Sequence, residues 1–481
     1  MPEAWQARLK HLVRCLAGWV DLPFAALYYA YSQLRCWSDG DAREHAFTVV
    51  IVAPHLGSRA AIGHELPFSL TLAARLRQQG TRVVVLAHRP LSATVVTAFE
   101  RHGVPCLPVF RHAGLGIIPR DVHDTNAGAL GRFVAHALTY AADLTLGLRR
   151  SGVGSARLLF LPTSALSCMV GSSLFRWPSA SRVSRGESQV HVVHRPQFLG
   201  EATSYPRYVR RRLRPLCRRG LHIGTVNPGV NAHLQALGET EAIPIPIPRA
   251  VEVRPRSSPA GAVRRIGFVG SVRVEKGCLM IPRVVERLLE HRRSLRIVVQ
   301  ATPFTDTPAV RTSLDLVRRL AAGSASVELI ERPLGMDEYH DLLDSLDVVV
   351  LPYDAHSYAR SISAVGVEAM AMGKVVVGPD VGWFAAQRSV YGGIVGVDTS
   401  DPERIASRII EVVDDFDRLT LEAARDAPNF AWHNVQSLVD VLIEVAARDG
   451  LEPAPGNQTP FGADTRPRTA HSSSSLTGFD R

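Results

Sequence analysis

The feature that most constrains the fold is an alternation between short, β-branched apolar runs and stretches with helical periodicity. Five such runs occur in the first half of the chain, at residues 49–53, 83–87, 158–161, 190–194 and 222–226. Between the first two, Leu66, Leu70 and Ala73 recur at helical spacing, and Gly80 closes the segment. Continuous apolar runs are typical of strands buried on both faces. The pattern predicts a parallel sheet covered by helices on both sides.

A second series of the same kind follows. Its apolar runs lie at residues 266–269, 295–299, 327–330, 348–351, 375–377 and 394–397. Ile281, Val284 and Leu288 share one helix face, and Pro282 falls in the first turn of that helix, where its missing N–H costs little. The chain therefore predicts two α/β domains, at 46–243 and 264–430.

Between the two series, residues 243–263 read IPIPIPRAVEVRPRSSPAGAV. Proline at every second position cannot continue a central strand or a helix. We expect an extended linker over 244–263. Residues 450–481 hold Pro, Gly, Ser and Thr with few large apolar groups, which is typical of a disordered tail.

Residues 1–45 are predicted to form an N-terminal helical segment. The first ten residues do not open a signal peptide. The stretch from Leu16 to Leu34 is apolar and rich in Trp and Tyr, but Asp21 and Pro23 interrupt it, so it predicts no transmembrane helix. Two alternatives stay open: a helix lying on a membrane surface, or a helix packed on the first domain.

The net charge of +10 favours anionic partners, including phosphate-bearing substrates and acidic membranes. Residues 207–219 read RYVRRRLRPLCRR, with Val209, Leu213 and Leu216 on one helix face. This segment either docks on an anionic bilayer or packs on the core with a solvated basic back. It matches no nucleic-acid motif and carries no interleaved aromatic residues, so we expect no nucleic-acid partner.

None of the six cysteines pairs at metal-ligand spacing, which favours a reduced, cytoplasmic location and no structural metal.

The first segment with recognisable chemistry is GFVGSVRVEKG at Gly267–Gly277, between a strand and a helix. Gly270 allows a backbone to approach a ligand closely. Arg273 and Lys276 are two cations at the mouth of the helix, where anions are already favoured. Together they suit a diphosphate. The alternative is a solvated basic turn.

The second segment runs from Leu351 to Gly378 as a strand end, a polar loop, a short helix from about Ser363, and another strand. Glu368 lies within the first turns of that helix. A carboxylate there can accept hydrogen bonds from two ribose hydroxyls, while free helix N–H groups, including those next to Ser363, face phosphate. The alternative for Glu368 is a favourable charge near a helix N-terminus.

These two segments together resemble the retaining glycosyltransferases of the GT-B fold, in particular glycosyltransferase family four. The sequence carries G-S-V-R-V-E-K-G from Gly270 and V-E-A-M-A-M-G-K-V-V-V from Val367, in the places of that family's glycine loop and its E-A-x-A-x-G-x-P-V-V segment. The first domain matches more loosely. Phe430-Ala431-Trp432 resembles the start of the family's last helix, which would place 431–449 back on the first domain.

The resemblance implies a role for each candidate. Arg273 and Lys276 would hold the donor's diphosphate, Glu368 would bind the nucleotide ribose, and His194 would lie near the transferred sugar. Backbone N–H groups near Gly57 or Gly63 would face donor or acceptor. The alternative for His194 is a histidine at the end of a strand whose hydrogen bonds are made within the protein, with no part in binding substrate. No bound cofactor and no metal is implied.

The sequence departs from the family in two places. The first glutamate of the family's pair is Arg360 here, a residue that would contact phosphate or an anionic sugar or would reach solvent. The family's arginine directly after the glycine is Ser271, and Arg273 stands two positions later. The choice of donor sugar therefore cannot be carried over from the family.

The resemblance predicts transfer of a sugar, with retention, from a nucleotide sugar to a lipid-linked or polysaccharide acceptor in a bacterium. Two other functions remain open: a sugar-nucleotide epimerase, and a non-catalytic scaffold that has lost the first glutamate. A nicotinamide-dependent oxidoreductase fits poorly, because neither domain begins with G-x-G-x-x-G after its first strand.

Overall fold

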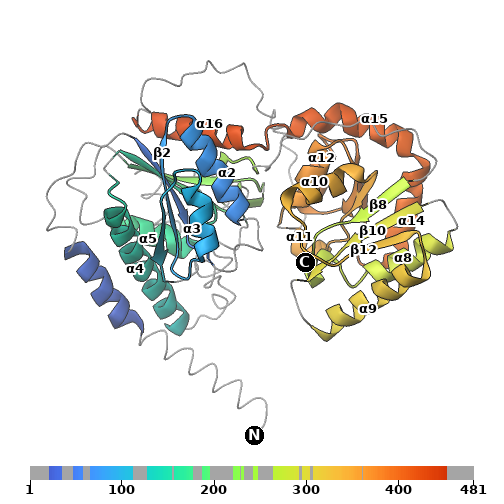
Figure 1. Ribbon diagram of the computed structural model, residues 1–481, viewed down its shortest axis with the longest axis horizontal. Coiled ribbons are helices and arrows are strands. Elements are labelled where there is room, and N and C mark those ends of the chain that lie inside the picture. The colour runs from blue at the N-terminus through green and yellow to red at the C-terminus, as the bar shows by residue number, and fades with distance from the viewer. Residues whose placement is uncertain are drawn as a thin grey trace, which may run out of the picture.

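The computed structural model describes residues 21–34, 47–57, 65–111, 127–153, 156–176, 187–194, 220–227, 229–231, 234, 242–247, 264–291, 295–303, 307–359 and 361–451. Within them the chain forms two α/β domains, which Figure 1 shows side by side and joined at one end.

A parallel seven-stranded sheet is the centre of the first domain, in the order β3-β2-β1-β4-β5-β6-β7. Its strands are β1 (Thr48–Ala53), β2 (Arg82–His88), β3 (Cys106–Phe110), β4 (Arg157–Leu161), β5 (Glu187–Val192), β6 (Leu221–Thr225) and β7 (Ile243–Pro244). The helices are α2 (Glu65–Gln78), α3 (Ala93–Glu100), α4 (Ala127–Arg150) and α5 (Leu166–Arg176). Val49 and Ile51 face the core on the α2 side, whereas Val50 and Val52 face the core that includes α4. Both faces of β1 are therefore buried, as its unbroken apolar run predicts.

A parallel six-stranded sheet forms the second domain, in the order β12-β10-β8-β13-β14-β15. The strands are β8 (Arg264–Phe268), β10 (Leu295–Gln300), β12 (Val327–Ile330), β13 (Val348–Val350), β14 (Val375–Pro379) and β15 (Ile394–Val397). A two-stranded sheet, β9 (Ser271–Val272) with β11 (Thr302–Pro303), follows β8 and β10. The helices are α8 (Ile281–Glu290), α9 (Pro308–Gly323), α10 (Met336–Ser345), α11 (Ala355–Tyr358), α12 (Ala364–Ala371), α13 (Gly382–Gln387), α14 (Pro402–Asp414) and α15 (Phe416–Asp426).

Both large sheets reverse their strand order beside their first strand. In the first domain the reversal lies between β1 and β4, and in the second it lies between β8 and β13. In open α/β sheets, ligands bind beyond the carboxyl ends of the strands at such a switch point. These two places are where a site is expected.

The last helix, α16 (Val435–Arg448), returns to the first domain (Figure 1). Leu438 and Leu442 are fully buried in the same apolar cluster as β1 and α2. The Arg75 Nε of α2 donates to Gln436 Oε1 at 2.6 Å. Two chain segments therefore pass between the domains, and they touch where the Ile247 amide donates to His433 Nδ1 at 3.1 Å.

Two features of the first sheet differ from the sequence prediction. Ile243–Pro244 is an edge strand, and Ile245 is buried in the core, so the first domain extends beyond residue 243. Proline is tolerated there because an edge strand has one side that makes no ladder hydrogen bonds. The strand β3 was not predicted, because Pro108 interrupts its apolar run at the opposite edge. Residues 248–263 of the predicted linker lie outside the described part of the chain.

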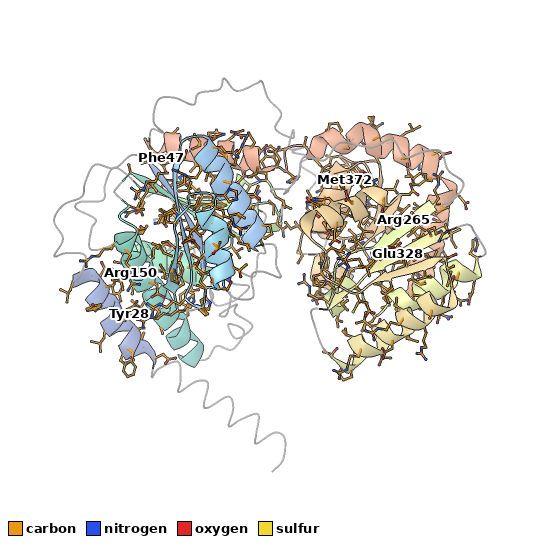
Figure 2. The ribbon with its side chains drawn as sticks, in the orientation of Figure 1. Tyr28, Phe47, Arg150, Arg265, Glu328 and Met372 are labelled. Atoms are coloured by element: carbon orange, nitrogen blue, oxygen red, sulfur yellow. The ribbon has the colours of Figure 1, made fainter. Side chains whose placement is uncertain are left out.

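Residues 21–34 form a helix that packs on the first domain, beside α4 and α5. Tyr28, labelled in Figure 2, donates its hydroxyl to Asp143 Oδ1 at 2.8 Å. The Tyr29 hydroxyl donates to the Leu174 carbonyl at 2.7 Å. Of the two alternatives for this segment, packing on the first domain is thus observed. Among the described residues, no helix combines the length and apolar character needed to cross a bilayer. The basic run at 207–219 and the tail from residue 452 are not among the described residues.

Candidate functional site

The loop after β8 is pressed against the end of β13, at the switch point of the second sheet. Gly270 and Gly277 have φ angles of 135° and 73°, in the region that favours glycine. A Cβ on Gly277 would lie 1.7 Å from the Pro352 carbonyl oxygen, and the Gly270 amide donates to Gln300 Oε1 at 2.7 Å. The two glycines therefore allow a close, fixed approach between loop and strand end.

The Lys276 side chain lies under this loop. Its Nζ would be 3.2 Å from a Cβ on Gly270, and it lies 5.9 Å from the centre of the Tyr353 ring. Burial, and after it the charge of Arg273, lower the pKa of Lys276 to about 8, against the opposing effects of the charges of Glu275 and Glu368. Lys276 is thus largely protonated at neutral pH but poorly solvated. A bound anion would stabilise that charge.

Arg273 is one-third exposed (32%) and is held from two sides. Its Nε donates to Ser271 Oγ at 3.1 Å, and its guanidinium pairs with Glu275 at 3.5 Å. The sequence predicted that Arg273 and Lys276 lie at the N-terminus of the following helix, but the structure differs from this prediction. Lys276 ends a three-residue 3₁₀ turn, Val274–Lys276, which Gly277 terminates in the left-handed conformation, and α8 begins only at Ile281. The two cations therefore flank a single tight turn rather than the first turn of an α-helix.

The second predicted segment is organised by the start of α12. Ser363 caps this helix, since its Oγ accepts from the Gly366 amide at 3.0 Å, and the same Oγ lies 3.4 Å from the Tyr353 hydroxyl. Glu368 is the fifth residue of α12, so it lies one turn further from the free N–H groups than a first-turn carboxylate would. Its charge acts on both Lys276 and Tyr353. The structure thus brings Glu368, Lys276, Arg273 and Ser363 around Tyr353.

Two tyrosines of this site were missed by the sequence analysis. Tyr353 is buried and follows β13 by three residues, so the rule that ligands bind at strand carboxyl ends could have found it. Tyr339 comes from α10, and its hydroxyl donates to Glu368 Oε2 at 2.7 Å. No spacing rule connects Tyr339 with Glu368. Burial, reinforced by neighbouring negative charge, raises the pKa of Tyr339 well above its usual value, so its phenol stays protonated.

A separate cluster of histidines lies at the switch point of the first sheet. His194 follows β5, and its Nε2 donates to the Pro162 carbonyl at 2.8 Å, just beyond β4. His55 follows β1; burial, then the charges of His88 and His194, lower its pKa to about 4. Its Nε2 is buried and has no hydrogen-bond partner in the structure as described. His194 was predicted from the sequence as a site residue, whereas His55 was not.

Gly57 belongs to the same cluster. A Cβ there would lie 3.1 Å from the Pro90 carbonyl oxygen and 3.3 Å from His88 Nδ1, so glycine permits close packing of the β1 and β2 loops. Gly63 and Arg360 lie outside the described residues. The candidates therefore fall into two groups: His194 and Gly57 on the first domain, and Gly270, Arg273, Lys276, Ser363 and Glu368 on the second.

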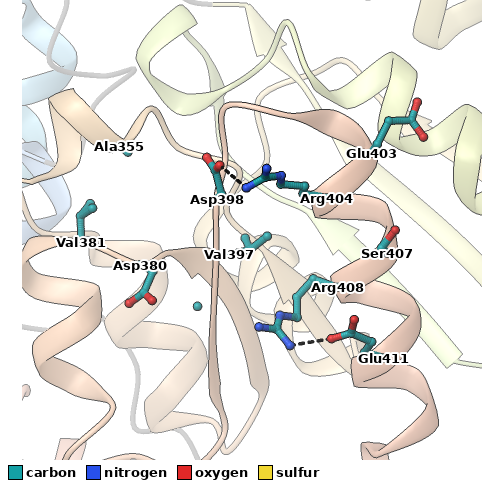
Figure 3. Close-up of a pocket in the computed structure, with 11 residues that line it drawn as sticks. Ala355, Asp380, Val381, Val397, Asp398, Glu403, Arg404, Ser407, Arg408 and Glu411 are labelled. Carbon is teal, nitrogen blue, oxygen red and sulfur yellow. Dashed lines mark hydrogen bonds and ion pairs between the residues drawn. The ribbon is translucent and has the colours of Figure 1, made fainter.

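A hollow of about 610 Å³ lies at the carboxyl ends of β14 and β15, apart from the two groups of candidate residues (Figure 3). Its charges are mostly paired with one another. Arg404 contacts Asp398 at 2.9 Å, and Arg408 contacts Glu411 at 2.5 Å. These cations have closer carboxylate partners than Arg273, which lies 3.5 Å from Glu275, so the hollow is a weaker candidate for a diphosphate than the Gly270 loop. Among the described residues, no group of three or more His, Cys, Asp or Glu side chains is arranged to hold a metal ion.

Residues 263–415 match the family described as glycosyl transferases, group 1. The second domain, which holds Gly270, Arg273, Lys276 and Glu368, is therefore similar to group 1 glycosyltransferases. The D-inositol 3-phosphate glycosyltransferase of Thermobispora bispora is 30% identical over 237 residues, which cover 47% of this chain and 51% of that protein. The chain therefore spans about half the length of this curated relative.

Over the described residues, the two-domain fold is that of the GT-B glycosyltransferases. A glycosyltransferase of Rickettsia africae superposes with a TM-score of 0.57 at 13% identity, over 83% of this chain and 99% of that one. Anabaena HepE in complex with UDP superposes with a TM-score of 0.56 at 14% identity, over 84% and 100% of the two chains. The GT-B fold predicted from the sequence is confirmed.

Proposed function

We propose that this chain transfers a hexosyl group, with retention, from a nucleoside-diphosphate sugar to a phosphate-bearing acceptor that is lipid-linked or part of a growing cell-surface polysaccharide. The observation that carries the proposal is the convergence of Lys276, Arg273 and Glu368 at the switch point between β8 and β13. Two cations beside a glycine loop suit a diphosphate, and a carboxylate on the next helix suits a ribose.

In the proposed reaction, the bond between the anomeric carbon and the donor phosphate oxygen breaks, and a bond to the acceptor oxygen forms on the same face. The leaving diphosphate takes the proton of the acceptor hydroxyl. Lys276 and Arg273 stabilise the negative charge that builds on the leaving group. These side chains would supply the positive charge that other enzymes take from a metal ion, so we propose that transfer continues in the presence of a chelator.

The first domain would hold the acceptor. Cationic and imidazole side chains follow its strands: His55 after β1, His88 and Arg89 at the end of β2, Arg111 after β3 and His194 after β5. The Arg111 side chain is 42% exposed, which leaves it within reach of a ligand. An acceptor that carries phosphate fits this edge better than a neutral sugar does.

A membrane surface would present a lipid-linked acceptor, and the helix of residues 21–34 would dock there. With one face held by Tyr28 and Tyr29, the helix exposes Phe24 and Leu27 at 70% each and Leu34 at 65%. Large apolar groups on an exposed helix face, in a chain of net charge +10, are typical of binding to an anionic bilayer. We therefore propose a peripheral position on the cytoplasmic face of the membrane.

A soluble phosphate-bearing polyol is the second candidate acceptor. It is favoured by the relative from Thermobispora bispora, which is named for D-inositol 3-phosphate. The same cationic edge of the first domain would serve either acceptor.

The test is a transfer assay with UDP-, GDP- and ADP-sugars against D-inositol 3-phosphate and against lipid-linked sugars from bacterial membranes, with and without chelator. The proposal predicts acceptor-dependent release of nucleoside diphosphate and a product with the donor's anomeric configuration, read by NMR. Lys276→Ala should lower the rate about 10²–10³-fold. Interconversion of donor sugars without an acceptor would instead establish an epimerase. Nucleotide binding without turnover on any acceptor would establish a scaffold.

A further inference from the structure

We infer that Tyr339 is a positioning residue, which holds the Glu368 carboxylate in the orientation that binds the nucleotide ribose. The inference rests on the proposed function, because it takes Glu368 as the ribose ligand. It concerns a residue on a different helix, 29 positions away from Glu368. Tyr339 would touch no substrate and would act only through the carboxylate.

The contact between the two side chains is well defined. The distance of 2.7 Å between the Tyr339 hydroxyl and Glu368 Oε2 is short, as in hydrogen bonds to charged acceptors. An ionised carboxylate can only accept, so the phenol must donate its single hydrogen. Because burial and the charge of Glu368 raise the pKa of Tyr339 well above its usual value, this donor is present at any working pH.

A nearby cation, Lys276, gives the hydrogen bond between Tyr339 and Glu368 a role. The charge of Glu368 acts on the poorly solvated Lys276, which burial has deprived of water. Opposite charges in a partly buried site attract strongly. A closer approach of the two would form an ion pair and withdraw both groups from a nucleotide diphosphate. The hydrogen bond from Tyr339 of α10 fixes one carboxylate oxygen of Glu368, and so it opposes such a rearrangement.

The experiment combines removal of the phenol oxygen with removal of the ribose hydroxyls. Binding of UDP, GDP and ADP to the full chain is measured by calorimetry, and the diphosphate that binds is compared with its 2′,3′-dideoxy analogue. The variants are Tyr339→Phe, Glu368→Gln and the double variant. Tyr391→Phe is the matched control, because the hydroxyl of Tyr391 donates at the same distance of 2.7 Å, but to the backbone carbonyl of Lys374.

Tyr339→Phe should weaken the ribonucleotide about tenfold and leave the dideoxy analogue within about twofold. It should have no further effect in the Glu368→Gln background, and Tyr391→Phe should not change the preference for ribose hydroxyls. Equal weakening of both ligands, or of neither, would overturn the role of Tyr339 while the proposed function stands. If the unmodified protein binds no nucleotide, or binds both forms equally, the donor-site assignment itself fails and the inference fails with it.

Discussion

Gly277 lies so close to Pro352 that a Cβ at position 277 would be 1.7 Å from the proline's carbonyl oxygen. This approach joins the two halves of the candidate donor site, because Gly277 ends the loop after β8 and Pro352 follows β13. Neither segment can shift without moving the other.

Gly277→Ala should therefore destabilise the protein by more than about 2 kcal/mol, through the φ of 73° and the backbone overlap together. Denaturant unfolding measures this difference. Gly323→Ala is the control: it ends α9, and a Cβ there meets nothing within 4 Å. A Gly277→Ala protein as stable as the Gly323→Ala protein would show that the close approach is not required.

Nucleotide affinity should depend on pH through Lys276. Since the pKa of Lys276 is lowered to about 8, the free protein loses this cation as pH rises through 8, and a bound diphosphate must then restore the proton. The affinity should be flat near pH 7 and fall up to about tenfold per pH unit above 8. Calorimetry at pH 7 and pH 9 tests this. In the Lys276→Ala variant the fall in affinity above pH 8 should disappear. If the fall were unchanged, a group other than Lys276 would be responsible for it.

His55 should make stability depend on pH in the acid range. Its pKa is lowered from 6.5 to about 4, so the folded state disfavours the protonated ring. Stability is therefore full above pH 6.5 and falls as pH drops from 6.5 towards 4, by about 2 kcal/mol at pH 5. Between pH 8 and pH 5, the free energy of unfolding of His55→Gln should therefore fall by about 2 kcal/mol less than that of the unmodified protein, as measured by denaturant unfolding. Parallel curves for both proteins would contradict the buried, neutral histidine.

Replacement of both Phe24 and Leu27 by serine should reduce binding to anionic lipid vesicles without loss of folding, because both side chains are 70% exposed. Sedimentation with phosphatidylglycerol vesicles measures this. Leu421→Ser is the control, since Leu421 is 72% exposed on α15 of the other domain. Binding that is unaffected by the double replacement, or equally affected by the control, would rule out this helix as the docking surface.

The sequence predicted the strands correctly where long apolar runs are buried. Long apolar runs such as 48–53 and 375–379 are strands because they are buried on both faces. The strand β3 escaped prediction because edge strands tolerate proline, as Pro108 shows.

The residues of the candidate donor site also divide into those that local sequence rules predict and those that only the fold brings together. Arg273, Lys276 and Glu368 could be named from motif and spacing. Tyr339 could not, because its contact with Glu368 depends on how α10 and α12 pack in three dimensions. His55 was missed for a similar reason: only the fold brings it to His88 and His194.

The central claim is that a nucleoside diphosphate binds between the β8 loop and α12. The most direct measurement is calorimetric binding of UDP, GDP and ADP to the unmodified protein, to Lys276→Ala, to Glu368→Ala and to Glu403→Ala. The Glu403 side chain lines the hollow at the ends of β14 and β15 and pairs with Arg283 and Arg287 of α8. The account predicts that one diphosphate binds, that the first two variants weaken it at least about tenfold, and that Glu403→Ala binds normally. Loss of binding in Glu403→Ala alone, or no binding to the unmodified protein, would contradict it.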